Sequence, residues 1–265
     1  MFGSRLNDEV AVNIAQYHIS GISSVDLSYS NSANTVKPLG SSRGLTTVGG
    51  ATQQKLSIAR HLIYNDPILN FTGSSFAING QIVYGGAAYG FGSGFLDSYS
   101  VNCAVGSVPK VNASISIFDE MDSSNETIED LSSNELAIRI PSQGSISATC
   151  KGSTTDRVIG FDYAIKMNRK PHFSIGSKTP VSVELIPPIE YTAQVQIEVD
   201  EIFPDNSLSF LSTREGDTVS FDIDGRDGIN LQALTIPNAT VVSESISASD
   251  NGSAILNINY IGHGF

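Results

Sequence analysis

The feature that most constrains the fold is a two-residue alternation of apolar and polar side chains. It runs through residues 99–105, 111–117, 195–199 and 256–260, where Ser, Asn, Gln or acidic residues separate the apolar positions. Successive side chains of a β-strand point to opposite faces, so this alternation predicts strands with one buried and one polar face. Turn sequences rich in Gly, Asn and Asp separate the segments. The chain is therefore predicted to be all-β.

Helical patterns are limited to two short candidates, at 7–17 and at 124–136. The second candidate falls in an acidic stretch, 119–135, with seven carboxylates and no Lys or Arg. Such a run of like charges is typical of a solvated segment, and we interpret it as a loop or short helix that connects two halves of the chain. An acidic surface that binds a partner is the alternative.

The order of sequence features in the first half recurs in the second, which predicts an internal duplication. Each half has an opening strand, a Lys-Pro pair, a long strand, a break with adjacent Asp and Pro, and a closing hairpin. The matched segments are 25–29 with 160–165, 37–38 with 170–171, 54–63 with 192–202, 81–84 with 218–221, 98–104 with 243–248, and 111–118 with 254–261.

The duplication suggests two tandem β domains. We expect a first domain at 1–120, with an N-terminal arm at 1–13, an acidic connector at 121–155, and a second domain at 156–265. Each domain is predicted to be a β-sandwich or β-barrel with little helix.

Charge and cysteine content exclude several classes of protein. The net charge of −12 lacks the Lys and Arg excess with which nucleic-acid binders neutralise phosphates. Neither an apolar secretory leader nor an apolar run long enough to span a bilayer is recognisable, so no membrane association is expected. Cys103 and Cys150 are too few for a disulfide scaffold and are expected to be reduced, buried thiols.

No motif in the sequence predicts catalysis or a cofactor. Residues 40–44 fit the G-x-S-x-G pattern but lie in a polar, glycine-rich loop instead of a strand–helix turn. The acidic turn with Asp222, Asp224 and Asp227 offers oxygen ligands for Ca²⁺. It lacks the full spacing of a calcium loop and contains Arg226, so a plain hairpin turn is the favoured interpretation. The protein is predicted not to be an enzyme.

A glycine-rich segment follows the predicted strand at 81–84. It has no Lys and no following helix, which excludes a phosphate-binding loop. It is interpreted as a mobile hairpin tip or as a place where backbones of neighbouring subunits approach closely. The candidate subunit-contact residues are Gly85, Gly86, Gly90, Gly92 and Gly94.

Part of the sequence resembles the major tail proteins, or tail tube proteins, of bacteriophages. Residues 94–118 resemble the closing hairpin of that family, and residues 66–84 resemble the segment that leads into it. Residues 19–29 look like its opening strand. The resemblance covers most of the first half and extends to the second through the duplication.

The resemblance implies a subunit in which one sheet lines a channel and long loops connect stacked rings. Family members typically supply one such domain, and six chains close a ring. Two domains in one chain imply a trimer with pseudo-sixfold symmetry. The implied partners are other copies of the chain, tape measure and terminator or hub proteins, and DNA that passes through the channel without specific binding. The implied location is the virion tail, assembled in the host cytoplasm.

The long segment 30–54 is predicted to be a loop that contacts the next ring, with a surface loop as the alternative. Its candidate contact residues are Lys37, Arg43, Gly44, Gly49 and Gly50. Two other functions stay open. One is a tail hub or distal ring protein of the same fold, and the other is a non-enzymatic β-sandwich binding module or adhesin, which the absence of Trp makes less favoured.

Overall fold

The structure is a computed structural model, and it confirms the all-β class. It describes residues 10–36, 46–84, 87–119, 121, 140–150, 153–175, 177–199, 216–225, 228–248 and 253–265. The predicted helix at 7–17 is wrong, because Val10–Ile14 form a strand that pairs on both sides. The second predicted helix, 124–136, lies outside the described residues.

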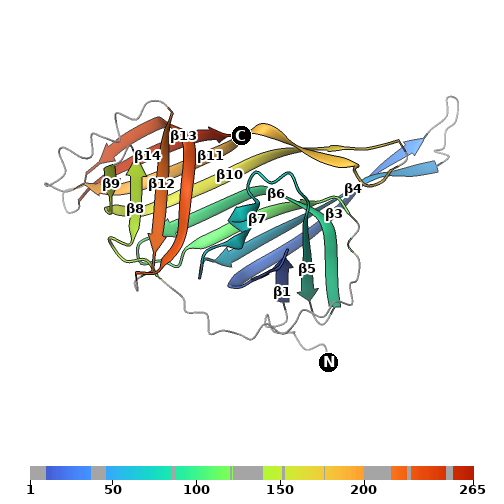
Figure 1. Cartoon of the computed structure of the whole chain (residues 1–265), viewed down its shortest axis with the longest axis horizontal. Coiled ribbons are helices and arrows are strands. Elements are labelled where there is room, and N and C mark those ends of the chain that lie inside the picture. The colour runs from blue at the N-terminus through green and yellow to red at the C-terminus, as the bar shows by residue number, and fades with distance from the viewer. Residues whose placement is uncertain are drawn as a thin grey trace.

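The described residues form fourteen strands and one short 3-10 helix, η2 (Pro67–Phe71) (Figure 1). The strands are β1 (Val10–Ile14), β2 (Tyr17–Ile19), β3 (Ile22–Val36), β4 (Thr46–His61), β5 (Ile78–Tyr84), β6 (Ala87–Ala104), β7 (Lys110–Ile117), β8 (Ile146–Cys150), β9 (Ser153–Thr155), β10 (Val158–His172), β11 (Ser182–Val199), β12 (Asp217–Asp224), β13 (Asn230–Ser247) and β14 (Ala254–Gly264).

The first seven strands and the last seven have the same pairing order. In the first set neighbours follow the order β2-β1-β5-β6-β7-β4-β3. In the second set the order is β9-β8-β12-β13-β14-β11-β10. Every strand of the second set occupies the place of the strand seven before it. We call the two sets the first repeat and the second repeat.

The irregularities of the sheet recur as well, and they align the repeats residue by residue. Three register shifts between paired strands of the first repeat each have a counterpart at the same place in the second repeat. The matched shifts are Ile22/Ser24 with Val158/Gly160, Ile78/Gly80 with Asp217/Val219, and Leu96/Ser98 with Val241/Ser243. Because bulges are specific local features of a strand pair, their recurrence makes equivalent positions unambiguous.

The sequence-based match of the two halves has the strands in the right order but is out of register in several of them. It set Gln81 against Thr218, whereas the strand registers set Gln81 against Ser220. A two-residue slip keeps the same face toward the core, so alternation alone cannot detect it. β8 and β9 lie within the segment predicted as a connector, in the places that β1 and β2 hold in the first repeat.

The two repeats are joined in one sheet through β6 and β10. Residues 98–104 of β6 pair with residues 160–166 of β10. This produces a ladder of eight strands in the order β3-β4-β7-β6-β10-β11-β14-β13. Figure 1 shows β8 and β12 crossing in front of this ladder in the second repeat, and β1 and β5 crossing in front of it in the first.

One hydrophobic core runs between these two layers. It includes Val12, Ile82, Leu56 and Val101 from the first repeat and residues such as Phe221 from the second. Cys103 and Cys150 are reduced thiols buried in this core, as predicted from the sequence. Most of the apolar face of the eight-strand ladder is therefore covered by the protein itself, and its polar face is left outward.

The predicted loop at 30–54 needs correction. Residues 30–36 belong to β3 and residues 46–54 belong to β4, and these pair from Ser30 with Gln53 to Val36 with Thr46. The long hairpins β3–β4 and β10–β11 both extend beyond the body toward the same end of the molecule (Figure 1). Residues 37–45, with Lys37, Arg43 and Gly44, lie outside the described residues.

Candidate assembly surface

The acidic turn considered above as a calcium site uses one of its carboxylates in a hydrogen bond across the hairpin. Asp222 and Asp224 lie on β12, and the Asp224 carboxylate accepts a hydrogen bond of 3.0 Å from the Asn230 amide across the turn. Asp227 lies outside the described residues. No group of three or more His, Cys, Asp or Glu side chains among the described residues is placed to hold a metal ion.

The glycine candidates fall at different places in the sheet. Gly90, Gly92 and Gly94 lie in β6, and Gly85 and Gly86 lie outside the described residues. A Cβ atom at Gly94 would lie 2.6 Å from Cε2 of the Phe91 ring, so this glycine is required by packing inside the chain. Contact between subunits stays a prediction for the others.

The glycines of the long β3–β4 hairpin lie in β4. Gly49 pairs with Ala33 of β3, and Gly50 lies at the register shift between that pair and the pair Thr52–Asn31. Both are therefore positions in a strand, and their predicted contact with a neighbouring ring stays a prediction.

The junction between β6 and β10 is fully packed on its core side. The cross-strand pairs there are Tyr99 with Ile165, Val101 with Tyr163, and Cys103 with Phe161, and all six side chains are at most 3% exposed. The Phe161 ring stacks on Phe221 of β12 with the ring centroids 5.1 Å apart. Burial of these apolar and aromatic side chains fixes the two repeats relative to each other.

The polar side of the same junction faces away from the core. Its cross-strand pairs are Ser98 with Lys166, Ser100 with Ala164, and Asn102 with Asp162. The Asn102 side-chain amide donates a hydrogen bond to the Asp162 carboxylate. This hydrogen bond to a charged carboxylate connects the two strands through their side chains, in addition to the backbone hydrogen bonds of the ladder.

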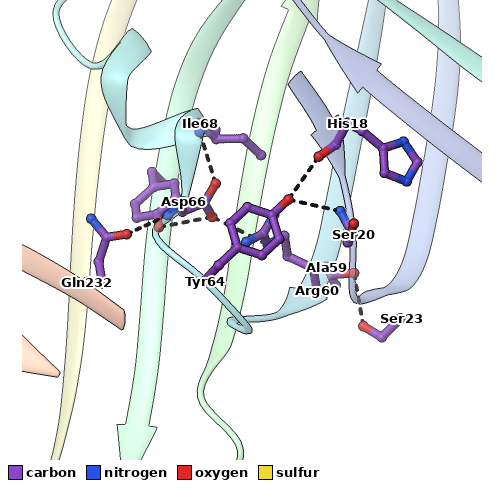
Figure 2. A network of polar contacts seen from close by, with 10 residues as sticks. His18, Ser20, Ser23, Ala59, Arg60, Tyr64, Asp66, Ile68 and Gln232 are labelled. Atoms are coloured by element: carbon purple, nitrogen blue, oxygen red, sulfur yellow. Dashed lines mark hydrogen bonds and ion pairs between the residues drawn. The ribbon is translucent and has the colours of Figure 1, made fainter. Parts of the chain in front are cut away.

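A buried polar network reinforces the junction from the core side (Figure 2). Arg60 of β4 and Asp66 are both completely buried, with Nε of Arg60 3.5 Å from Oδ2 of Asp66. The Asp66 carboxylate accepts hydrogen bonds from the Ile68 backbone at 2.9 Å and from the Tyr99 hydroxyl at 3.2 Å. The Asp66 backbone N–H donates to the side chain of Gln232, on β13 of the second repeat, at 2.7 Å.

This network is structural and spans both repeats. Burial raises the pKa of Asp66. The Arg60 charge and the two hydrogen bonds that the Asp66 carboxylate accepts, from Ile68 and Tyr99, act to lower this pKa. Burial and the neighbouring Asp66 carboxylate raise the pKa of the Tyr99 hydroxyl well above its ordinary value. The guanidinium group of Arg60 also lies 5.1 Å from the centre of the Tyr64 ring. A buried charge requires such partners, so the network fixes the Asp66 loop against β13.

The equivalents of the junction strands lie at the two ends of the eight-strand ladder. β3 is the counterpart of β10, and residues 243–247 of β13 are the counterpart of residues 98–102 in the joined part of β6. Among the described strands, β3 pairs with β4 alone, and this part of β13 pairs with β14 alone. We call them the β3 edge (residues 24–30) and the β13 edge (residues 240–247).

Both open edges carry exposed apolar side chains. Leu27 is 44% exposed and Tyr29 is 62% exposed on the β3 edge, and Val242 and Ile246 are each 64% exposed on the β13 edge. A groove of about 470 Å³ borders the β3 edge, lined by residues that include Val25, Leu27, Ile82, Tyr84 and Tyr89. Exposed apolar edge strands are sites of pairing with another chain.

The outward face of the eight-strand ladder is dominated by uncharged polar groups. A shallow hollow of about 500 Å³ lies over β6, β10, β11 and β14 on this face. The polar residues of the face include Ser57, Ser100, Asn102, Asn112, Gln194, Gln196, Asn257 and Asn259. Asp26 and Asp162 occupy equivalent positions on β3 and β10, and both are exposed.

No protein-family model matches the chain, and a search of curated proteins finds no significant match. Among the described residues, no helix has the length and apolar character that a membrane crossing requires.

Sequence reasoning missed the buried network and the junction. Arg60 falls at an apolar position of the alternating pattern after Leu56 and Ile58, and a charge at such a position signals a buried ion pair. The Asp66-Pro67 break marked the partner, but nothing in the sequence connects it to Gln232.

Proposed function

We propose that this protein is a structural subunit whose copies join edge to edge into a ring, and that the stacked rings form the tail tube of a bacteriophage. The observation that carries the proposal is the eight-strand ladder. The two repeats already join through β6 and β10, and the counterparts of those strands, β13 and β3, are open edges at the two ends of the ladder. A unit that joins in this way adds copies head to tail until the ring closes.

Three copies give a ring of suitable size. With eight strands from each copy and a strand spacing of about 4.8 Å, the barrel has a circumference of about 115 Å and a backbone diameter of about 37 Å before strand tilt widens it. The ring then contains six equivalent β units, in agreement with the pseudo-sixfold symmetry that the sequence resemblance implies. A channel of this width admits a nucleic-acid duplex.

The polar face of the ladder suits the wall of such a channel. The protein covers most of the apolar face with its own strands, so the Ser, Asn and Gln side chains are the ones left to line the interior. Asp26 and Asp162 place a carboxylate at the same position of every unit around the ring. Acidic residues outnumber Lys and Arg by 27 to 15 in the sequence, and the resulting net charge of −12 disfavours adhesion of phosphates, so DNA passes without specific binding.

Stacking of rings is proposed to use the end of the β3–β4 hairpin, which extends beyond the body of the molecule (Figure 1). Lys37 and Arg43 lie in the segment that connects these strands. The double substitution Lys37→Glu and Arg43→Glu is expected to leave rings intact and to prevent tube growth, seen by electron microscopy. Tubes of normal length would exclude this stacking role. The tape measure and the terminator or hub proteins are the proposed partners at the tube ends.

Negative-stain electron microscopy of the purified protein, with its mass in solution measured alongside, tests the proposal. Rings with pseudo-sixfold symmetry and tubes made of them support it. Rings that never stack under concentrating conditions would instead indicate a hub or distal ring protein. A monomer that never assembles would overturn the proposal and favour a binding module.

A further inference from the structure

We infer that the β13 edge of one copy pairs antiparallel with the β3 edge of a second copy, in the register of the junction inside the chain. This inference rests on the edge-to-edge assembly proposed above and specifies which residues meet. The partner is a second copy because both halves of the interface lie on the same chain, at opposite ends of one ladder.

The register follows from the equivalence of the two repeats. Inside the chain, Ser98 pairs with Lys166 and Asn102 pairs with Asp162. The matched bulges make Ser243 the counterpart of Ser98 and Ser30 the counterpart of Lys166. The transferred pairs between two copies are therefore Ser243 with Ser30, Glu244 with Tyr29, Ser245 with Ser28, Ile246 with Leu27, and Ser247 with Asp26.

On the core side, the inferred interface and the β6–β10 junction both pair apolar side chains at equivalent positions. Ile246 and Leu27 are the counterparts of Val101 and Tyr163, which contact each other across the junction and are 1% and 2% exposed. Ile246 and Leu27 are instead 64% and 44% exposed in the isolated chain. Pairing in the transferred register brings these two apolar side chains together and removes both from water.

The polar side offers a matching hydrogen bond. Asp162 accepts one from Asn102 at the junction inside the chain. Its counterpart Asp26 is exposed and lies opposite Ser247 in the transferred register. The Ser247 hydroxyl is a donor of the kind that a carboxylate accepts, so the second interface keeps the chemistry of the first.

The groove beside the β3 edge leaves the first repeat partly uncovered there, as far as the described residues extend. In the second repeat, the equivalent positions hold the larger Phe161 and Phe221, which are buried and whose rings stack on each other. The first repeat has the smaller Val25 and Ile82, which line the groove of about 470 Å³. The apolar side of a neighbouring β13 edge lies against this groove in the transferred register and covers it.

Disulfide cross-linking tests the register directly. The double variant Leu27→Cys and Ile246→Cys places thiols on directly opposed residues of two copies, where Cα separations of about 4.5–5.5 Å permit a disulfide. After mild oxidation, most of the chain is expected to run as covalent dimers and closed trimers on non-reducing gels. A second variant in the same register, Tyr29→Cys with Glu244→Cys, is expected to cross-link in the same way.

The matched control shifts one partner by a single residue. In the variant Leu27→Cys with Ser245→Cys, the two thiols lie on opposite faces of the sheet, so cross-linked species are expected to fall to the wild-type level. The native thiols do not interfere, because Cys103 and Cys150 are 1% and 2% exposed. Cross-linking of the shifted control in place of the two in-register variants would overturn the inference.

The same samples, viewed by electron microscopy, separate the two proposals. Tubes that form without cross-links at either in-register pair would leave the proposed function standing and overturn the register. Cross-linked rings that never stack would confirm the register and contradict the tail tube.

Discussion

The joined β6–β10 junction and the two open edges use equivalent strands in different surroundings. At the junction, Tyr163 and Val101 are almost completely buried, and their counterparts Leu27 and Ile246 are largely exposed. Asp162 accepts a hydrogen bond from Asn102, and its counterpart Asp26 faces solvent. On the assembly proposed above, the open edges lack the partner that the junction already has within the chain.

The junction and the open edges are expected to contribute to different stabilities, the first to the fold of the single chain and the second to the assembly of copies. Side chains at the junction stabilise the fold of the single chain, because the chain itself buries them. Side chains at the open edges add little to that fold and are expected to act only when another copy is present. A substitution at the junction should therefore lower the stability of the monomer, whereas the equivalent substitution at an open edge should weaken assembly and leave monomer stability nearly unchanged.

The largest expected effect follows truncation of Tyr163. Tyr163→Ala removes a buried ring and the hydrogen bond of 2.9 Å that its hydroxyl donates to the Thr235 carbonyl, so the free energy of unfolding should fall by about 4 kcal/mol. The matched variant Leu27→Ala should change the stability of the monomer by less than about 0.5 kcal/mol and weaken assembly. Urea unfolding and sedimentation measure the two effects. Equal losses of monomer stability would contradict the comparison.

Loss of the Asp66 carboxylate is expected to be nearly as costly. Asp66→Ala leaves the Arg60 guanidinium buried without its ion-pair partner, which should lower the free energy of unfolding by at least about 3 kcal/mol. Asp26→Ala, on the β3 edge, is the exposed control and should stay within about 0.5 kcal/mol of wild type in the monomer. If Asp66→Ala unfolds like wild type, the network does not stabilise the junction.

A smaller loss is expected at the contact between Asp66 and the second repeat. Gln232→Ala removes the acceptor of the Asp66 backbone N–H and leaves that buried group unsatisfied, at a cost of about 1–3 kcal/mol. The double variant with Asp66→Ala should lose less than the sum of the two single changes, because both act on one network. Full additivity in urea unfolding would show that the two residues act independently.

The smallest effect concerns the Cys103 thiol at the junction. Burial raises its pKa to about 12 from an ordinary value of 9.0, so at pH 8 its thiolate is about a thousandfold rarer than that of an exposed cysteine. In a Cys150→Ala background, labelling by a thiol reagent should be slow in the native protein and fast in urea. Rapid native labelling would mean that the junction opens readily.

The sequence was sufficient for the class of fold and for the order of the repeat. Alternation around Val111, Val195 and Leu256 predicted real strands because burial of one face of a sheet imposes a two-residue period. The strand register could not be predicted from the sequence, because a slip of two residues preserves the two-residue period. The bulges at Leu96/Ser98 and Val241/Ser243, which settle the alignment, have no distinctive residue type.

The candidate surface depended on contacts between distant parts of the chain. Asp66 and Gln232 are far apart in sequence, and the pairing of β6 with β10 helps to bring their repeats together. Leu27 and Ile246 look like ordinary apolar strand positions in the sequence. Their exposure, and hence their proposed role, is apparent only when each is compared with its buried counterpart.

Amide hydrogen exchange on assembled and dilute protein tests the central claim most directly. The account predicts that residues 98–104 and 160–166 are protected in both states. Amides of residues 26–30 and 243–247 that point away from β4 and β14 should exchange fast in the dilute monomer and slowly in the assembly. Fast exchange at either open edge in assembled particles would contradict the claim that these edges pair as the junction does.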